Sequence, residues 1–209
     1  MRIQAVIFDM DGTLIDSIPA VVVALQETFR RFTGQDYSPE AIIGMFGPTE
    51  EGVIIPRVAP ADADAAVRYY TERYEALHNA EPFPGVTGLL KRLHEHGIHT
   101  GIVTGKGPGS AEISMRVTGL DRYIETVATG SPNGSIKPLA IREMLAGWGV
   151  EPHRAAYVGD MPYDMQAARE AGVIPIGAGW ADSATVTEDG GGQVFRSIAE
   201  LENWIFRSK

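Results

Sequence analysis

The sequence predicts an α/β fold, in which a doubly wound parallel sheet carries an all-helical insertion after its first strand. Three observations lead to this prediction. Short apolar runs recur along the chain, helical patterns lie between them, and one long stretch near the N-terminus shows helical patterns alone. Alternation of strands and helices is typical of a parallel sheet that helices cover on both faces.

The strands are predicted from apolar runs that lack a strict polar alternation. Such runs indicate strands that are buried on both faces. Four of these runs are clear and a fifth is weaker. The clear ones are Ala5–Phe8, Thr100–Val103, Ala155–Val158 and Val173–Ile176, and the weaker one is Thr126–Ala128.

Helices are predicted between these strands from apolar residues at helical spacing. The stretch 85–96 ends at Gly97, the stretch Leu139–Trp148 shows one apolar face, and the stretch Asp164–Ala171 ends at Gly172. Right-handed crossovers place the carboxyl ends of parallel strands at one edge of the sheet, where such sheets bind ligands.

Residues 17–81 break this alternation. Three helical patterns occur there, at Pro19–Phe32, Ser38–Met45 and Ala61–Asn79, and none of the stretch resembles a strand. The sequence therefore predicts two domains. Residues 1–16 and 82–209 form an α/β core and residues 17–81 form a helical insertion, with EPFPGV as a stiff hinge.

Composition excludes several classes of protein. The chain has 209 residues, 44% of them hydrophobic, and a net charge of −9, so a basic nucleic-acid-binding surface is not expected. Without cysteine there is no disulfide, thiolate or cysteine–zinc chemistry. No signal peptide or membrane-spanning run is evident. We expect a cytoplasmic protein without membrane or nucleic-acid partners, and leave open whether it is a monomer or a homodimer.

Acidic residues follow two of the predicted strands. Asp9 and Asp11 follow the first strand with only Met10 between them, and Asp160 and Asp164 follow the strand at 155–158. Carboxylates crowded at one sheet edge repel one another unless a cation offsets them. Magnesium suits such a set because it is a hard ion that prefers oxygen ligands. We therefore expect a Mg²⁺ site.

The same edge offers the groups needed for phosphoryl transfer. With Mg²⁺ and Lys137 near it, Asp9 stays ionised and could attack phosphorus, and Asp11 could act as acid and base. Thr104 and the backbone of the 10–14 turn, which includes Thr13, could hold phosphate oxygens. Lys137 would neutralise charge on the transferring group.

The motifs DMDGTLIDS, VTGKG, the lysine of IKP, and VGDMPYD occur in the order found in the haloacid dehalogenase superfamily. The chain resembles its phosphatase branch with a helical cap, and in particular phosphoglycolate phosphatase-like proteins. The resemblance implies a Rossmann-like core, Asp9 as nucleophile and Asp11 as acid/base. It also implies Mg²⁺ bound by the Asp9 side chain, the Asp11 main-chain carbonyl and Asp160, with Asp164 supporting the metal or Lys137.

The resemblance also indicates how a substrate would be bound. In similar capped phosphatases a cap loop reaches the active site, which makes Thr49 and Glu50 candidate substrate-binding residues, although Thr49 could equally be a helix N-cap. Gly105, in the glycine-rich 105–110 stretch before a helix, could help seat a phosphate.

A small phosphorylated metabolite is the expected substrate. Three alternatives stay open: a sugar-phosphate mutase similar to β-phosphoglucomutase, a 2-haloacid dehalogenase, and a non-catalytic binding protein of the same fold.

Overall fold

The structure, a computed structural model, describes residues 2–79, 81–134, 136–188 and 192–207. Its strands are β1 (Ala5–Phe8), β2 (His99–Val103), β3 (Thr126–Ala128), β4 (Ala155–Gly159), β5 (Ile174–Ala178) and β6 (Gln193–Phe195). Its helices are α1 (Ile18–Thr33), α2 (Pro39–Ile43), α3 (Glu50–Ile54), α4 (Ala63–Leu77), α5 (Val86–Glu95), α6 (Pro108–Thr118), α7 (Lys137–Trp148), α8 (Pro162–Ala171) and α9 (Ile198–Arg207). Short 3₁₀ helices are η1 (Ile55–Arg57), η2 (Pro60–Asp62), η3 (Leu120–Arg122) and η4 (Pro152–Arg154).

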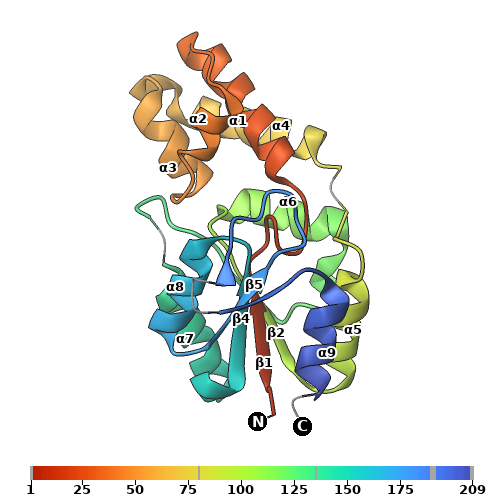
Figure 1. The fold of residues 1–209 in the computed structure, drawn as a ribbon. Helices are drawn as coiled ribbons and strands as arrows, with labels where there is room; N and C mark the ends of the chain where they lie inside the picture. The colour runs from red at the N-terminus through yellow and green to blue at the C-terminus, as the bar shows by residue number, and fades with distance from the viewer. Residues whose placement is uncertain (1, 80, 135, 189–191, 208–209) are drawn as a thin grey trace.

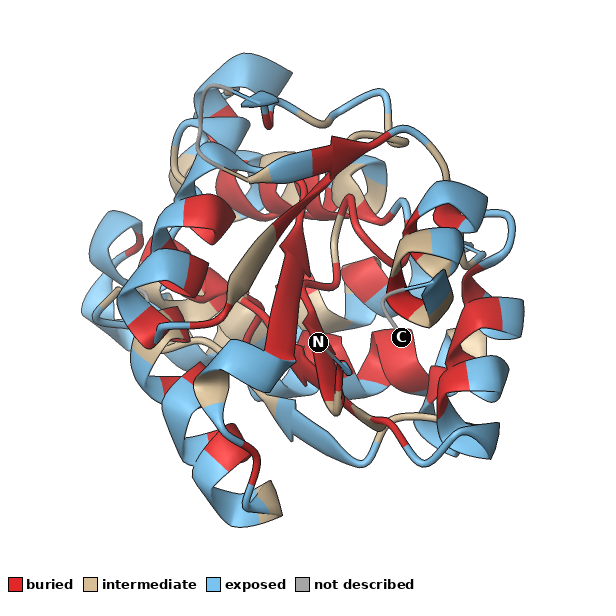
Figure 2. Ribbon diagram, turned by 60° about the horizontal axis from the view of Figure 1, so that its bottom comes forward, coloured by how far each residue is buried: buried red, intermediate tan, exposed pale blue. Residues whose placement is uncertain are grey.

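The strands form one parallel sheet in the order β3-β2-β1-β4-β5-β6. The sheet is covered on both faces, with α7 and α8 on one side and α5 and α9 on the other (Figure 1). Its central strands are buried (Figure 2). The predicted doubly wound α/β fold is therefore confirmed.

Strand β1 shows how the sheet divides the core. Val6 and Phe8 pack into the apolar cluster that contains α5 and α9, whereas Ala5 and Ile7 pack into the cluster that contains α7 and α8. Successive side chains of a strand point to opposite faces, so an uninterrupted apolar run fills both layers.

The helices α1 to α4 (residues 18–77) form a helical unit above the carboxyl ends of the strands, and the rest of the chain is the α/β unit (Figure 1). The helical unit has its own apolar cluster, to which the α/β unit contributes Ile113 of α6. The two connections between the units run side by side. Ile15 bridges to Pro82, and the amide of Phe83 donates to the carbonyl of Leu14 at 2.9 Å.

The predicted and observed elements differ mainly at their ends and near the C-terminus. Strands β1 and β3 have the predicted bounds, and β2, β4 and β5 are shifted or extended by one or two residues. Strand β6 and helix α9 were not predicted. In the described parts of the chain, none of the helices combines the length and apolar character needed to cross a bilayer.

Candidate active site

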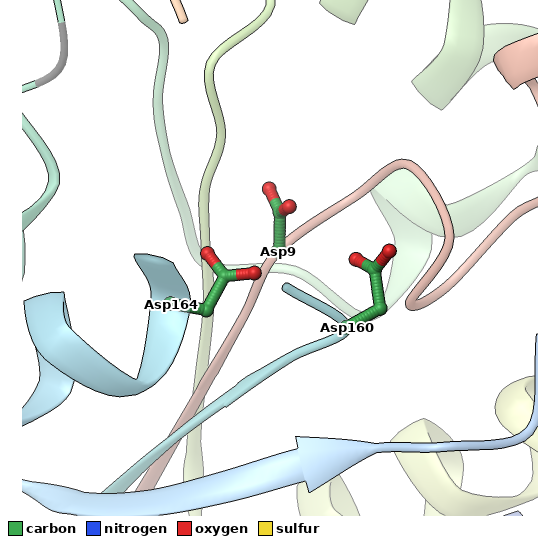
Figure 3. Close-up of side chains that lie close together, drawn as sticks. All are labelled: Asp9, Asp160 and Asp164. Atoms are coloured by element: carbon green, nitrogen blue, oxygen red, sulfur yellow. The ribbon is translucent and has the colours of Figure 1, made fainter. Parts of the chain in front are cut away.

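The candidate site lies at the carboxyl ends of β1 and β4, which are neighbours in the sheet. Asp9 follows β1, Asp160 follows β4, and Asp164 lies in the first turn of α8. All three side chains are buried, and each offers a carboxylate oxygen within 4.8 Å of the others (Figure 3). Strand pairing thus brings together carboxylates that lie about 150 residues apart in the chain.

Lys137 lies between two of these carboxylates. Its Nζ is 3.1 Å from Asp9 Oδ2 and 2.7 Å from Asp164 Oδ1. Burial by itself would lower the pKa of Lys137, but Asp164 and Asp9 together raise it well above its usual value. The helix predicted over Leu139–Trp148 begins two residues earlier in the structure, so Lys137 is the first residue of α7.

One lysine does not offset the three carboxylates. Burial raises the pKa of Asp9 to about 7 in spite of Lys137. Burial, together with the charges of Asp9 and Asp164, raises the pKa of Asp160 to about 8. Asp9 Oδ1 and Asp160 Oδ2 are buried and have no hydrogen-bond partner among the described residues. Two such oxygens, beside a third carboxylate, suit a hard divalent cation.

The turn after β1 supports this group. Gly12 adopts a positive φ of 74°, and a Cβ atom there would lie 2.4 Å from Asp160 Oδ2. Thr13 Oγ1 donates to Asp160 Oδ1 at 3.1 Å, and the indole of Trp180 donates to the carbonyl of Thr13 at 2.9 Å. Amides 12 to 14 donate to carbonyls within the turn. The predicted contact of Thr13 with substrate stays a prediction.

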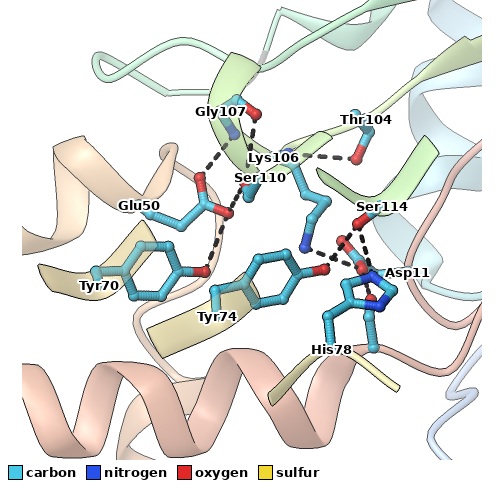
Figure 4. Close-up of polar contacts among 11 residues, drawn as sticks. Asp11, Glu50, Tyr70, Tyr74, His78, Thr104, Lys106, Gly107, Ser110 and Ser114 are labelled. Atoms are coloured by element: carbon cyan, nitrogen blue, oxygen red, sulfur yellow. Dashed lines mark hydrogen bonds and ion pairs between the residues drawn. The ribbon is translucent and has the colours of Figure 1, made fainter. Parts of the chain in front are cut away.

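Asp11 faces the helical unit and is not part of the carboxylate group. Its Oδ1 accepts hydrogen bonds from Ser17 Oγ and from Lys106 Nζ, the latter at 3.2 Å (Figure 4). The Lys106 side chain is 3% exposed, and its Nζ lies 4.3 Å from the ring centroid of Tyr74. Burial opposes the charge of Lys106, but Asp11 and Tyr74 raise its pKa above its usual value.

Sequence reasoning did not assign Lys106, although it lies within the quoted motif VTGKG. The usable signal was its place two residues after Thr104, a predicted site residue at the end of β2. Thr104 is buried, and its hydroxyl accepts a hydrogen bond from the amide of Lys106 at 3.2 Å. Gly105 lies against Gly130, where a Cβ would be 2.2 Å from the Gly105 carbonyl oxygen.

The loop before α3 reaches the α/β unit. The amide of Thr49 donates to the carbonyl of Ser131 at 3.2 Å, and the Thr49 hydroxyl makes no capping hydrogen bond. Glu50 Oε2 accepts from the amide of Gly107 at 2.7 Å, and its Oε1 accepts from Ser110 Oγ at 2.5 Å (Figure 4). Glu50 therefore binds the N-terminus of α6.

Polar contacts from α4 and from His78, which follows it, complete this interface. Tyr70 OH donates to Glu50 Oε1 at 3.3 Å. Tyr74 OH and His78 Nε2 lie 2.7 Å and 3.0 Å from Ser114 Oγ of α6. The structure thus brings Asp9, Lys137, Asp160 and Asp164 into one group, and it places Asp11 beside Lys106 at the boundary with the helical unit.

Comparisons with known proteins agree on one family. The sequence model of the haloacid dehalogenase-like hydrolases matches residues 6–178. The chain is 32% identical to a phosphoglycolate phosphatase of Rhodospirillum rubrum, over 97% of this chain and 90% of the relative. It is 28% identical to the pyrophosphatase PpaX of Bacillus pumilus, over 86% of this chain and 84% of the relative.

Solved structures show the same fold. The crystal structure of CbbY from Rhodobacter sphaeroides, in complex with phosphate, matches with a TM-score of 0.81 at 23% identity, covering 95% of this chain and 96% of that one. A haloacid dehalogenase-like hydrolase from Streptococcus pneumoniae matches with a TM-score of 0.77 at 25% identity, covering 97% and 98%.

Proposed function

The chain belongs to the family of haloacid dehalogenase-like hydrolases, and on that premise we propose that it is a Mg²⁺-dependent phosphatase of a small phosphorylated metabolite. The observation that carries the proposal is the position of Asp9. Its carboxylate meets Lys137 through one oxygen, and its other oxygen is buried without a partner among the described residues, beside Asp160 and Asp164.

Asp9 acts as the nucleophile in this proposal. A carboxylate oxygen of Asp9 forms a bond to phosphorus while the bond from phosphorus to the leaving oxygen breaks, which gives an aspartyl-phosphate. Asp11, in its protonated form, donates its proton to the leaving oxygen. Asp11 then takes a proton from water, and that water attacks phosphorus and releases phosphate from Asp9.

Other residues neutralise charge on the phosphoryl group or orient the groups that do so. Lys137 neutralises charge on the phosphoryl group, and Asp164 orients the lysine through the 2.7 Å contact. Asp164 is itself oriented, because its Oδ2 accepts from the amide of Met161 at 3.0 Å. The Thr104 hydroxyl is proposed to donate to a phosphate oxygen. Mg²⁺, held by Asp9, Asp160 and the Asp11 main-chain carbonyl, would supply positive charge to the phosphate oxygens.

The helical unit is proposed to be a cap domain, residues 17–81, over a core of residues 1–16 and 82–209. Its position above the strand ends supports this role, and Thr13, Thr49, Glu50 and Gly105 stay proposed substrate-binding residues. The names of the relatives make phosphoglycolate and pyrophosphate the first substrates to test. A cytoplasmic location belongs to the same proposal.

The test is release of phosphate from phosphoglycolate, pyrophosphate and other small phosphoesters, with Mg²⁺ and with EDTA. We expect release that requires Mg²⁺ and is abolished in Asp9→Asn, while circular dichroism shows that the variant is folded. Near wild-type release by Asp9→Asn would refute the nucleophile. Isomerisation of a sugar phosphate without net phosphate release would indicate a mutase.

A further inference from the structure

Lys106 is a buried cation to which the proposed mechanism gives no role. Its side chain is 3% exposed, and it comes from the loop between β2 and α6. Removing an ammonium from water is costly, so a buried lysine needs compensating contacts. Among the described residues, Lys106 donates a hydrogen bond to Asp11 and contacts the ring and the hydroxyl group of Tyr74. An ammonium has three N–H donors, so Lys106 has the capacity for a further acceptor beside these two.

Lys106 lies beside Asp11, the proposed general acid. If Asp11 protonates the leaving oxygen, the leaving group must approach the Asp11 carboxyl to hydrogen-bond distance. Lys106 Nζ is 3.2 Å from Asp11 Oδ1, so it lies within a few bond lengths of that leaving oxygen. Lys137, in contrast, contacts Asp9 and Asp164. The two lysines thus divide the site into a phosphoryl side and a leaving-group side.

We propose that Lys106 determines specificity by binding an anionic group on the leaving group, close to the leaving oxygen. The preferred substrates are then small phosphoesters or phosphoanhydrides whose leaving group is acidic. Glycolate carries a carboxylate in that position, and the phosphate that leaves pyrophosphate carries its own charge. This inference rests on the proposed function and adds the residue that selects among its substrates.

The charges around Lys106 support this role. Its ammonium group is already removed from water and is held beside the Asp11 carboxylate and the ring of Tyr74. An anionic group on the leaving group would therefore meet a desolvated cation, to which attraction is stronger than it is in water. The Tyr74 ring lies against Lys106 and stacks on the buried ring of Tyr70, so aromatic side chains border this side of the lysine (Figure 4).

The experiment compares two substrates that differ in one group. Phosphoglycolate carries a carboxylate where hydroxyethyl phosphate carries a neutral hydroxymethyl group. We expect wild-type kcat/KM to favour phosphoglycolate by about 10- to 100-fold, which is the range for a hydrogen bond to a charged group. Lys106→Met should reduce this ratio toward unity, because loss of the Asp11 contact slows both substrates and loss of the anion contact slows one. Lys106→Arg should retain the preference.

Pyrophosphate is assayed in parallel, because its leaving group is a phosphate whereas that of phosphoglycolate carries a carboxylate. A wild-type enzyme that hydrolyses both members of the pair equally would overturn the inference, as would a Lys106→Met variant that slows both by the same factor. If Lys106→Met does not fold, the inference is tested by the ratio of kcat/KM for the two substrates in the wild type and in Lys106→Arg. If none of the substrates gives Mg²⁺-dependent release of phosphate, the proposed function is refuted, and so is the inference that rests on it.

Discussion

At the residue scale, the site is a balance between carboxylates and lysines. Lys137 offsets Asp9 and Asp164, and Lys106 offsets Asp11. Burial still dominates at Asp9 and Asp160, whose pKa values rise to about 7 and about 8. A divalent cation would neutralise the remaining negative charge, which supports the proposed Mg²⁺ site.

Gly12 is the residue where this arrangement is least tolerant of change. We predict that Gly12→Ala destabilises the protein by about 1–2 kcal/mol, because alanine at a positive φ is strained. It should also displace the Asp160 carboxylate, since the new Cβ would lie 2.4 Å from Asp160 Oδ2. The concentration of Mg²⁺ required for half-maximal phosphatase activity should therefore increase.

Gly34→Ala is the matched control for this variant. Gly34 has a φ of 70°, and a Cβ there would meet nothing within 4 Å. The control should lose stability to denaturant without a change in its Mg²⁺ requirement. An unchanged Mg²⁺ requirement in Gly12→Ala as well would show that Asp160 does not depend on this close approach.

The sequence predicted which residues gather at the strand ends better than it predicted which residues contact them. Asp9, Asp160 and Lys137 could be assigned because strand ends converge and because the motifs occur in a known order. Lys106 was not assigned: its place after Thr104 was a signal, but its contacts with Asp11 and Tyr74, which are distant in sequence, could not be predicted. Spacing along a chain does not reveal which buried side chains meet across two units.

At the element scale, the sequence predicted five strands, including the edge strand β3, and missed the other edge strand, β6. Strand β6 has three residues and lies at the edge, and Gln193 is exposed, so its sequence carries little signal. Helix α9 did carry a signal, since Ile198, Leu201 and Ile205 recur at helical spacing and are buried.

The contact between α3 and α6 depends on Glu50. Its carboxylate accepts from Gly107 and Ser110 at the N-terminus of α6, where negative charge is favourable. In Glu50→Gln the glutamine oxygen can still accept from Gly107 and its amide can face the hydroxyl of Ser110, but the negative charge is lost. We predict a loss of about 1–3 kcal/mol in the free energy of unfolding, because hydrogen bonds to a charged group and the interaction with the helix N-terminus are weakened. Urea denaturation followed by circular dichroism measures it.

Glu72→Gln provides the comparison on the exposed surface of α4. The same change of chemistry at an exposed position should alter stability by less than about 0.5 kcal/mol. Equal changes in the free energy of unfolding at both positions would mean that the Glu50 contacts do not stabilise the interface between the units.

At the scale of the whole molecule, two units with separate apolar clusters meet through a largely polar boundary. Within the described residues, Ile113 is the α/β-unit member of the buried helical-unit cluster. Across the same boundary, hydrogen bonds are made by Thr49, Glu50, Tyr74 and His78, and Lys106 contacts the ring of Tyr74. Polar interfaces between units favour relative motion. This supports the proposed cap, because a cap must open for substrate and close to exclude water.

The balance of charge also predicts how the whole protein responds to pH. The folded state raises the pKa of Asp9 to about 7 and of Asp160 to about 8, whereas unfolding returns both to their usual value of 3.8. Between these values the folded state binds more protons than the unfolded state. These two groups therefore lower the free energy of unfolding as pH rises from about 4 to about 8 in EDTA.

Magnesium should reverse this loss of stability. Because the cation competes with protons for the same oxygens, we expect Mg²⁺ to raise the urea midpoint more at about pH 8 than at about pH 5. Asp160→Asn removes one titrating carboxylate, so in EDTA its stability should depend less on pH than that of the wild type, and it should gain less from Mg²⁺. A wild type whose pH dependence in EDTA equals that of Asp160→Asn would mean that Asp160 is ionised without a metal. The argument that burial leaves Asp160 in need of a cation would then fail, and the proposed Mg²⁺ site would depend on the activity assay alone.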